Sequence, residues 1–246
     1  TKIHDNNFVS NYGISLYRHN SMTIEKNVIN LNPAFSGTAA YGIYIAGCDG
    51  DLRIMKNKIA PNTNAFLFVM DGIKIDPFNG TSGIIANNMI TIPVGTGMYI
   101  GDCVNLKIFY NTVKCYSSSS GDVAFRNSTG VNLKNNIFVQ MADFSASTLT
   151  YDVINSQIMT NHNNFYFLSS YMLRYLEHGL ISTFSEYKSL TGQDLNSVSK
   201  IVNFVSLNDL HLYGTSIGDE DLVGIPLTEV TDDIDGNPRD PVYPYM

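Results

Sequence analysis

Hydrophobic and polar residues alternate in short runs from residue 1 to about residue 166, and the runs recur around one asparagine. This asparagine occurs seven times in the same setting, at Asn7, Asn27, Asn57, Asn88, Asn111, Asn136 and Asn164. Two positions after it there is always an apolar residue, namely Val9, Ile29, Ile59, Ile90, Val113, Phe138 or Tyr166. Alternation with a period of two predicts β-strands and argues against helical repeats.

The spacing of the asparagines indicates how the strands are arranged. Successive copies lie 20, 30, 31, 23, 25 and 28 residues apart, so each unit joins a constant core to loops of variable length. Repeats of this period are typical of solenoids, whose units bury their apolar faces by stacking on one another. Each unit holds a strand such as residues 42–45, a second strand such as 52–54, the asparagine, and a brief third strand. The sequence therefore predicts an all-β fold, a parallel β-helix with three strands per coil and about seven coils over residues 1–166.

The repeat unit also carries a family resemblance. A Gly-Ile-x-Ile run, as at residues 42–45, is followed by Ile-x-x-Asn-x-Ile, as at 54–59. This pattern resembles the right-handed parallel β-helix families that include pectate lyase-like and polygalacturonase-like proteins, over roughly residues 1–166. The resemblance implies that the asparagine lies in the turn between the second and third strands and bonds to its equivalents in adjacent coils. Amide side chains supply both donors and acceptors, so copies stacked about 4.8 Å apart can pair in a ladder.

Residues 167–246 depart from the repeat, and we expect them to form an appendage that packs on the last coils. The run from Thr183 to Glu186 is a capping box that predicts one short helix ending near Gly192. Residues 201–205 and 210–213 have the pattern of short strands. Segments 189–197, 209–212 and 233–239 resemble the C-terminal end of secreted Bacteroidetes β-helix proteins of the choice-of-anchor type. That resemblance implies an exported protein, extracellular or at the cell surface, in contact with polysaccharide.

Composition narrows the range of partners. A hydrophobic content of 44% with 15% charged residues suits a narrow apolar core, and the formal net charge of −7 disfavours nucleic acid. No apolar stretch is long enough for a membrane span. We also expect the protein to be a monomer. The chain opens inside a repeat, so we expect further sequence upstream of residue 1. Cys48 and Cys103 occupy equivalent places with Phe78 between them, which predicts buried apolar fillers rather than a disulfide.

Side chains fill the interior of a β-helix, so a ligand must lie on the outside of a sheet. In the families resembled, that surface is formed by the first strand of each coil. Its outward positions form two columns, Ser15, Tyr44, Lys74, Tyr99 and Ala124 in one and Tyr17, Ala46, Asp76, Gly101 and Arg126 in the other, with Tyr12, Tyr41, Asp71 and Asp122 near the strand starts. Tyrosine rings stack on sugar rings, while charged groups bind hydroxyls or uronate carboxylates. The predicted substrate-binding residues are therefore Tyr17, Tyr44, Tyr99, Asp71 and Asp122.

The same surface contains the predicted catalytic residues, Lys74, Asp76, Asp102 and Arg126. In a polysaccharide lyase, Lys74 and Arg126 supply the base and the cation, and Asp76 or Asp102 can hold calcium. In a glycoside hydrolase, Asp76 and Asp102 form the pair of carboxylates. The sequence motifs of polygalacturonases are missing, which disfavours that type of hydrolase. Two alternatives stay open: a non-catalytic glycan-binding or adhesive surface protein, and a sheet face whose residues serve propensity and solubility only.

Metal sites have little support in the sequence. The five histidines show no ligand spacing. Asp233, Asp235 and Asn237 have the opening alternation of a calcium loop, but Pro238 interrupts it, and a plain turn is the alternative. We therefore predict no metal and no cofactor, with calcium as the open alternative.

Overall fold

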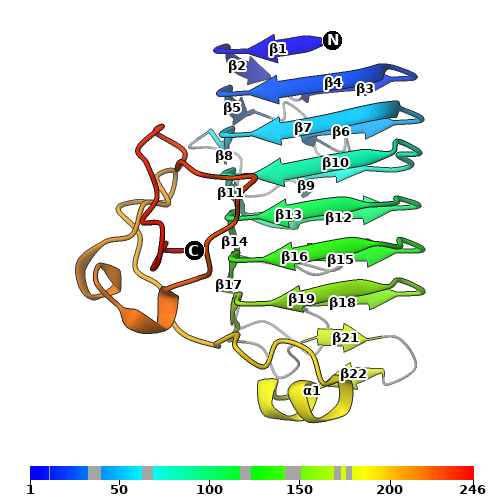
Figure 1. Ribbon diagram of the computed structural model, residues 1–246. Helices are drawn as coiled ribbons and strands as arrows, with labels where there is room; N and C mark the ends of the chain where they lie inside the picture. The colour runs from blue at the N-terminus through cyan, green and yellow to red at the C-terminus, as the bar shows by residue number, and fades with distance from the viewer. Residues whose placement is uncertain are drawn as a thin grey trace.

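The computed structural model describes residues 1–10, 12–32, 40–62, 69–116, 123–141, 151–168, 173–175 and 179–246. Three sheets run the length of the solenoid, and the strands stack one above another from the N-terminal end (Figure 1). The first sheet contains β3 (Tyr12–Tyr17), β6 (Ala40–Ala46), β9 (Val69–Ile75), β12 (Val94–Gly101), β15 (Val123–Arg126), β18 (Tyr151–Ile154), β21 (Leu173–Tyr175) and β22 (Leu180–Ile181).

The other two sheets are entirely parallel. The second sheet contains β1 (Lys2–His4), β4 (Asn20–Glu25), β7 (Asp49–Met55), β10 (Ser82–Ala86), β13 (Leu106–Phe109), β16 (Val131–Lys134) and β19 (Ile158–Asn161). The third sheet contains β2 (Asn7–Ser10), β5 (Val28–Leu31), β8 (Lys58–Pro61), β11 (Met89–Ile92), β14 (Thr112–Cys115), β17 (Ile137–Gln140) and β20 (Asn164–Tyr166). In the first sheet, β22 is antiparallel to β21 and ends the parallel stacking.

The predicted fold class is confirmed, with a small correction to the coil count. In the described part of the chain, six successive sets of first-, second- and third-sheet strands follow β1 and β2, so about seven coils is slightly high. Strand register places equivalent apolar residues directly above one another in the interior. One such buried column consists of Ile14, Ile43, Ile73, Met98 and Val123. Each coil thus buries its apolar face against the next, as the repeat predicts.

A ladder of buried asparagines occupies the turn between the second and third sheets. Asn27, Asn57, Asn88, Asn111 and Asn136 are its central members, as predicted. In each step the backbone N–H and the side-chain amide donate to the same oxygen of the next copy, as from Asn57 N (3.0 Å) and Nδ2 (2.9 Å) to Asn88 Oδ1. The Asn88 amide also donates to the carbonyl of Ile54 at 2.9 Å. These bonds satisfy polar groups that water cannot reach.

At both ends of the ladder, the predicted asparagine is wrong by one residue. The terminal copies are Asn6, whose N and Nδ2 donate to Asn27 Oδ1 at 3.1 and 3.0 Å, and Asn163, whose Oδ1 accepts from Asn136 N and Nδ2 at 2.9 Å. Asn7 and Asn164 instead begin third-sheet strands. A shift of one residue reverses the face of every side chain in a strand. Accordingly, Phe165 is buried in the core, whereas Val9 is 63% exposed.

The cysteines are confirmed as buried fillers. Cys48, Phe78 and Cys103 stack on one another through isolated parallel bridges, and both cysteines are free thiols. Burial, which disfavours the thiolate, raises the pKa of Cys103 to about 12.

The C-terminal residues begin with the predicted helix, α1 (Phe184–Thr191). The Thr183 hydroxyl accepts from Glu186 N at 3.1 Å, and Gly192 ends the helix with a left-handed φ of 65°. None of the helices in the described residues is long and apolar enough to cross a membrane.

After α1 the chain returns along the third sheet, beside β17, β14 and β11 (Figure 1). The expected strands at 201–205 and 210–213 are wrong, because only Phe204 and Leu212 form an antiparallel bridge. These two residues instead pack against a buried cluster that includes Ile137 and Val139 of β17, so contacts with the coils replace strand pairing.

Candidate functional site

On the first sheet, three of the predicted residues, Tyr44, Lys74 and Tyr99, lie in one row. Register pairs Ser15 with Tyr44, Tyr44 with Lys74, Lys74 with Tyr99, and Tyr99 with Ala124 across five neighbouring strands. The row therefore runs along the solenoid axis, with one residue from each coil. Neighbouring parallel strands lie about 4.8 Å apart, so each side chain can contact the next.

Lys74 lies at the centre of this row, among three tyrosine rings. Its Nζ lies 5.4 Å from the ring centroid of Tyr41, 5.8 Å from that of Tyr44 and 5.1 Å from that of Tyr99. At these distances the ammonium is attracted to the negative faces of the rings. Asp71 and Asp76 are also close enough to interact electrostatically with Lys74. These surroundings suit a cation, and they equip Lys74 to attract an anionic or hydroxyl-rich ligand.

Tyrosines extend from Lys74 toward the N-terminal end of the sheet. Tyr41 stacks on Tyr12 (centroids 6.0 Å apart) and on Tyr44 (5.1 Å), and Tyr17 meets Tyr44 edge to face at 5.4 Å. We call these four residues the aromatic strip. Although they contact other rings, Tyr12 and Tyr17 are 47% and 58% exposed. Burial raises the pKa of Tyr41 and of Tyr44, which keeps both phenols protonated and able to donate at neutral pH.

The predicted carboxylates lie on the Lys74 strand and just beyond the next one: Asp71 and Asp76 at the two ends of β9, and Asp102 after β12. Asp71, near the start of β9, accepts from Thr96 N at 3.3 Å, and burial raises the pKa of its carboxyl group while Lys74 lowers it. Asp76 follows β9, and its pKa is raised by burial and then by the negative charge of Asp102, with Lys74 acting in the opposite direction. Asp102 accepts from Asn127 Nδ2 at 3.2 Å. Asp76 and Asp102 therefore form a pair of interacting carboxylates in different surroundings.

Tyr99 connects the four predicted catalytic residues. Lys74 contacts the Tyr99 ring. Burial raises the pKa of the Tyr99 phenol most, and Asp76, Asp102 and Asp71 raise it further, while Arg126 lowers it. Register places Arg126 beside Gly101. A Cβ added at Gly101 would lie 2.8 Å from Cε1 of Tyr99 and 3.1 Å from the Asp76 carboxyl. The missing side chain at Gly101 thus leaves room for the ring and the carboxylate on either side.

Not all predicted residues can be placed. Asp122 lies outside the described residues, so its position relative to Lys74 is not assigned. Tyr17 belongs to the aromatic strip through its contact with Tyr44. The ring that lies beside Lys74 is Tyr41, which the sequence indicates only as a residue near a strand start. Tyr41 could have been found from its place in the repeat, because register puts it between Tyr12 of the preceding coil and Asp71 of the following one.

Pockets formed by the described residues include one lined by the second sheet, one between the third sheet and the C-terminal segment, and one within that segment. No group of three or more His, Cys, Asp or Glu side chains in the described ranges could hold a metal ion. In the acidic loop, Asp233 accepts from Asp235 N (2.9 Å), Asn237 N (2.8 Å) and Asn237 Nδ2 (3.1 Å), which are the contacts of a turn.

Three parallel sheets with a stacked asparagine turn define a parallel β-helix, and comparison with known proteins gives the family. The chain belongs to the family described as "Right handed beta helix region", whose model matches residues 1–171. No curated protein and no solved structure matches the chain significantly. The finer resemblances, to pectate lyase-like proteins and to choice-of-anchor ends, stay predictions.

Proposed function

We propose that the outer face of the first sheet binds a polysaccharide of the extracellular or cell-surface environment. The observation that carries this proposal is the row in which Lys74 lies among Tyr41, Tyr44 and Tyr99. Sugar rings have apolar faces that stack on tyrosine and hydroxyls that accept from ammonium and phenol groups. Tyrosine rings stand on neighbouring coils on both sides of Lys74, so a chain of sugars can contact several of these groups along the solenoid axis.

The alternative is that these side chains stabilise the sheet and have no ligand. Cross-strand aromatic pairs contribute about 0.2 to 1 kcal/mol each, which is reason enough for tyrosines to stack. Two features favour a ligand. The aromatic strip ends in rings that remain half exposed, and the groups beside it are charges of both signs rather than the like-charged lysines that protect sheets from association.

Binding to a panel of neutral and uronate-containing polysaccharides tests the proposal. Tyr44→Ala and Lys74→Met should each weaken binding about tenfold or more, equivalent to about 1.4 kcal/mol. Tyr213→Ala is the matched control, because Tyr213 is also exposed (61%) but belongs to the appendage. Equal losses for Tyr213→Ala and Tyr44→Ala, or no binding by the wild-type chain to any member of the panel, would contradict the proposal.

A second candidate function is hydrolysis of the bound chain, and the carboxylate pair favours it. Burial and Asp102 raise the pKa of Asp76, which favours the protonated form that a general acid needs. In this mechanism Asp76 donates its proton to the glycosidic oxygen. Asp102 then acts as base toward water or as nucleophile, depending on the separation of the carboxyl groups. Lys74 and Arg126 orient the substrate.

A lyase would use the same residues differently, with Lys74 as the base and Arg126 neutralising a uronate carboxylate. Release of reducing ends without ultraviolet absorbance, lost in Asp76→Asn and Asp102→Asn, would establish the hydrolase. Absorbance from unsaturated products, lost in Lys74→Met, would establish the lyase. Binding without either product would favour the non-catalytic glycan-binding or adhesive protein.

A further inference from the structure

A second candidate site lies between the C-terminal segment and the third sheet, on a different sheet from the proposed polysaccharide surface. It is a pocket of about 170 Å³ where the returning chain passes over β11 and β14. Much of its wall is apolar, with Met89 on one side and Leu210, Ile234 and Met246 on the other. An apolar cavity of about 150 Å³ accommodates benzene, so this pocket can hold a compact organic group.

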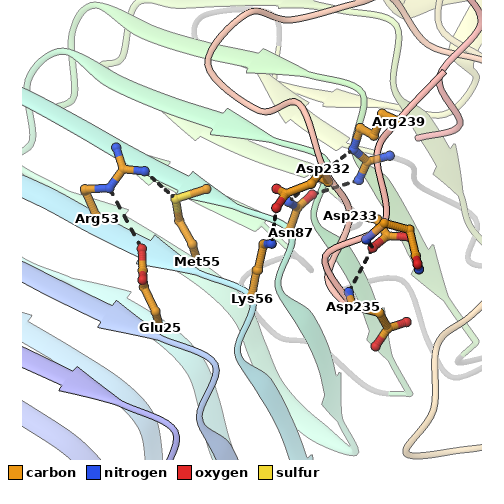
Figure 2. Close-up of polar contacts among 10 residues, drawn as sticks. Glu25, Arg53, Met55, Lys56, Asn87, Asp232, Asp233, Asp235 and Arg239 are labelled. Atoms are coloured by element: carbon orange, nitrogen blue, oxygen red, sulfur yellow. Dashed lines mark hydrogen bonds and ion pairs between the residues drawn. The ribbon is translucent and has the colours of Figure 1, made fainter. Parts of the chain in front are cut away.

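Arg239 provides a positive charge in the wall of this pocket. Its guanidinium lies over the ring of Tyr110, 3.7 Å from the centroid. Nε donates to the carbonyl oxygen of Asp232 (3.1 Å) and Nη2 to Asn87 Oδ1 (2.7 Å) (Figure 2). Nη1 donates to the carbonyl oxygen of Tyr245 (2.7 Å). All three acceptors are neutral oxygens. A guanidinium has five N–H donors, so two remain after these bonds.

In the described part of the chain, no carboxylate lies within ion-pair distance of Arg239. By contrast, the exposed Arg53 lies 4.0 Å from Glu25 (Figure 2). The nearby carboxylates are bound elsewhere: Asp232 by Lys56 at 2.5 Å, Asp235 by Lys58 at 3.6 Å, and Asp233 by the amides of its own turn. Burial lowers the pKa of Arg239, against the opposing effects of Tyr110, Asp233 and Asp232. A guanidinium largely removed from water and without a carboxylate at contact distance is costly, and such charges in proteins are normally paired.

We propose that this pocket binds a small monocarboxylate with a compact apolar body. The carboxylate matches the fork geometry of a guanidinium, and the apolar part of the ligand would fill the space between Met89 and Leu210. Asp233 also lines the pocket and disfavours a ligand with two negative charges. Inorganic anions would leave the apolar walls uncovered. Thr112 lines the same pocket from β14, so its side chain limits the size of the ligand.

Calorimetry and thermal shift with three probes test this site. Benzoate carries both the charge and the apolar ring, benzamide has the ring without the charge, and sulfate has charge without the ring. Benzoate should bind and raise the unfolding temperature, while benzamide and sulfate should bind at least tenfold more weakly. Arg239→Met should weaken benzoate binding by about 10- to 100-fold, the effect of a lost charged hydrogen bond. Arg53→Gln is the matched control and should leave benzoate binding unchanged.

Arg239 also holds the C-terminal segment, so its replacement can loosen the fold, and a second variant avoids this. Thr112→Leu fills the pocket but keeps every contact of Arg239, and it should weaken benzoate at least tenfold without lowering the unfolding temperature of the free protein. Absence of benzoate binding, binding of benzamide or sulfate as tight as that of benzoate, or full binding by Thr112→Leu would each overturn the proposal. None of these results depends on polysaccharide binding.

Discussion

Two rows of side chains run the length of this solenoid, and they differ in every respect except direction. The asparagine ladder is uniform and buried, and each central copy makes the same bonds to its neighbours. The row on the first sheet changes from the exposed Ser15 to the half-buried Tyr44, Lys74 and Tyr99 and the buried Ala124. Identical asparagines in a stack satisfy each other's hydrogen-bond donors and acceptors, whereas different residues in a stack present a varied surface. We therefore assign stability to the first row and ligand recognition to the second.

The largest effect is expected in the middle of the ladder. Asn88→Ala removes the acceptor for Asn57 N and Nδ2 and the donor to Ile54 O and Asn111 Oδ1. Leaving these buried groups without partners should lower the free energy of unfolding by about 3 kcal/mol, measured by urea denaturation. Asn30→Ala is the matched control, since its amide bonds to Asn7 at the surface (3.3 Å) and should change stability by under about 0.5 kcal/mol. Similar stability losses for the two variants would show that the buried ladder contributes no more to stability than an amide at the surface.

The next effect concerns Asp194, where the ladder ends. Its carboxylate accepts from Thr160 Oγ1 (3.0 Å), Asn163 Nδ2 (3.3 Å), Tyr187 Oη (2.9 Å) and the Ser197 hydroxyl. Burial nevertheless raises its pKa above the ordinary value of 3.8, although these four donors lower it. Asp194→Asn should cost about 1 to 3 kcal/mol of unfolding free energy at pH 5, because donors lose their acceptor.

The pH dependence of this variant follows from the sign of the shift. A carboxyl group whose pKa is raised by folding contributes most to the free energy of unfolding below its unfolded pKa. That contribution is lost as pH rises through the folded pKa. The deficit of Asp194→Asn should therefore shrink between pH 4 and pH 8, since only the wild type titrates at this position. Urea denaturation of both proteins at several pH values measures it, and a deficit that grows with pH would show that the carboxylate is stabilised in its charged form.

Changes in the outer row should affect the ligand more than the fold. Gly101→Ala places a methyl group 3.1 Å from the Asp76 carboxyl and 2.8 Å from the Tyr99 ring, so both side chains must move. We expect a loss of about 1 kcal/mol in stability and a several-fold loss in polysaccharide affinity or turnover. A loss of stability with unchanged polysaccharide affinity would show that Tyr99 and Asp76 do not contribute to ligand binding.

The smallest effect is expected from calcium removal. The Asp233 carboxylate is already bound by amides of its own turn, and the charge on Asp102 makes ionisation of Asp76 harder. A chelator should therefore change the unfolding temperature and polysaccharide affinity by less than the error of the measurements. A clear fall in either quantity, restored by added calcium, would establish a calcium site.

Sequence reasoning gave the class of fold and the central part of the ladder because both depend on local periodicity. It placed the ladder ends wrongly where two asparagines are adjacent, as at Asn6 and Asn7 or Asn163 and Asn164. Each pair is followed by apolar residues in both possible registers, such as Phe8 and Val9, so the pattern alone cannot choose between them. Contacts with adjacent coils decide the register, because they bury one of the two residues.

The candidate site was predictable to the same extent. Equivalent positions in successive coils become neighbours, so the row containing Tyr44, Lys74 and Tyr99 follows from the repeat. The enclosure of Lys74 by three rings depends on side-chain conformations, and Tyr41 reaches it from the position directly before the Gly-Ile-Tyr-Ile run at 42–45. Arg239 was visible in the sequence only as part of a motif. Its contacts with Tyr110 and Asn87 join positions more than a hundred residues apart, beyond any local pattern.

The measurement that tests the assignment of the two rows most directly is made on Lys74→Met. Its polysaccharide affinity and its free energy of unfolding are determined together, beside the wild type and Tyr213→Ala. We predict an affinity loss of at least about tenfold with a stability change below about 1 kcal/mol, because the lysine lies on the surface among rings that remain stacked without it. Unchanged affinity, or a fall in stability large enough to account for the lost binding, would contradict the assignment of recognition to the first sheet.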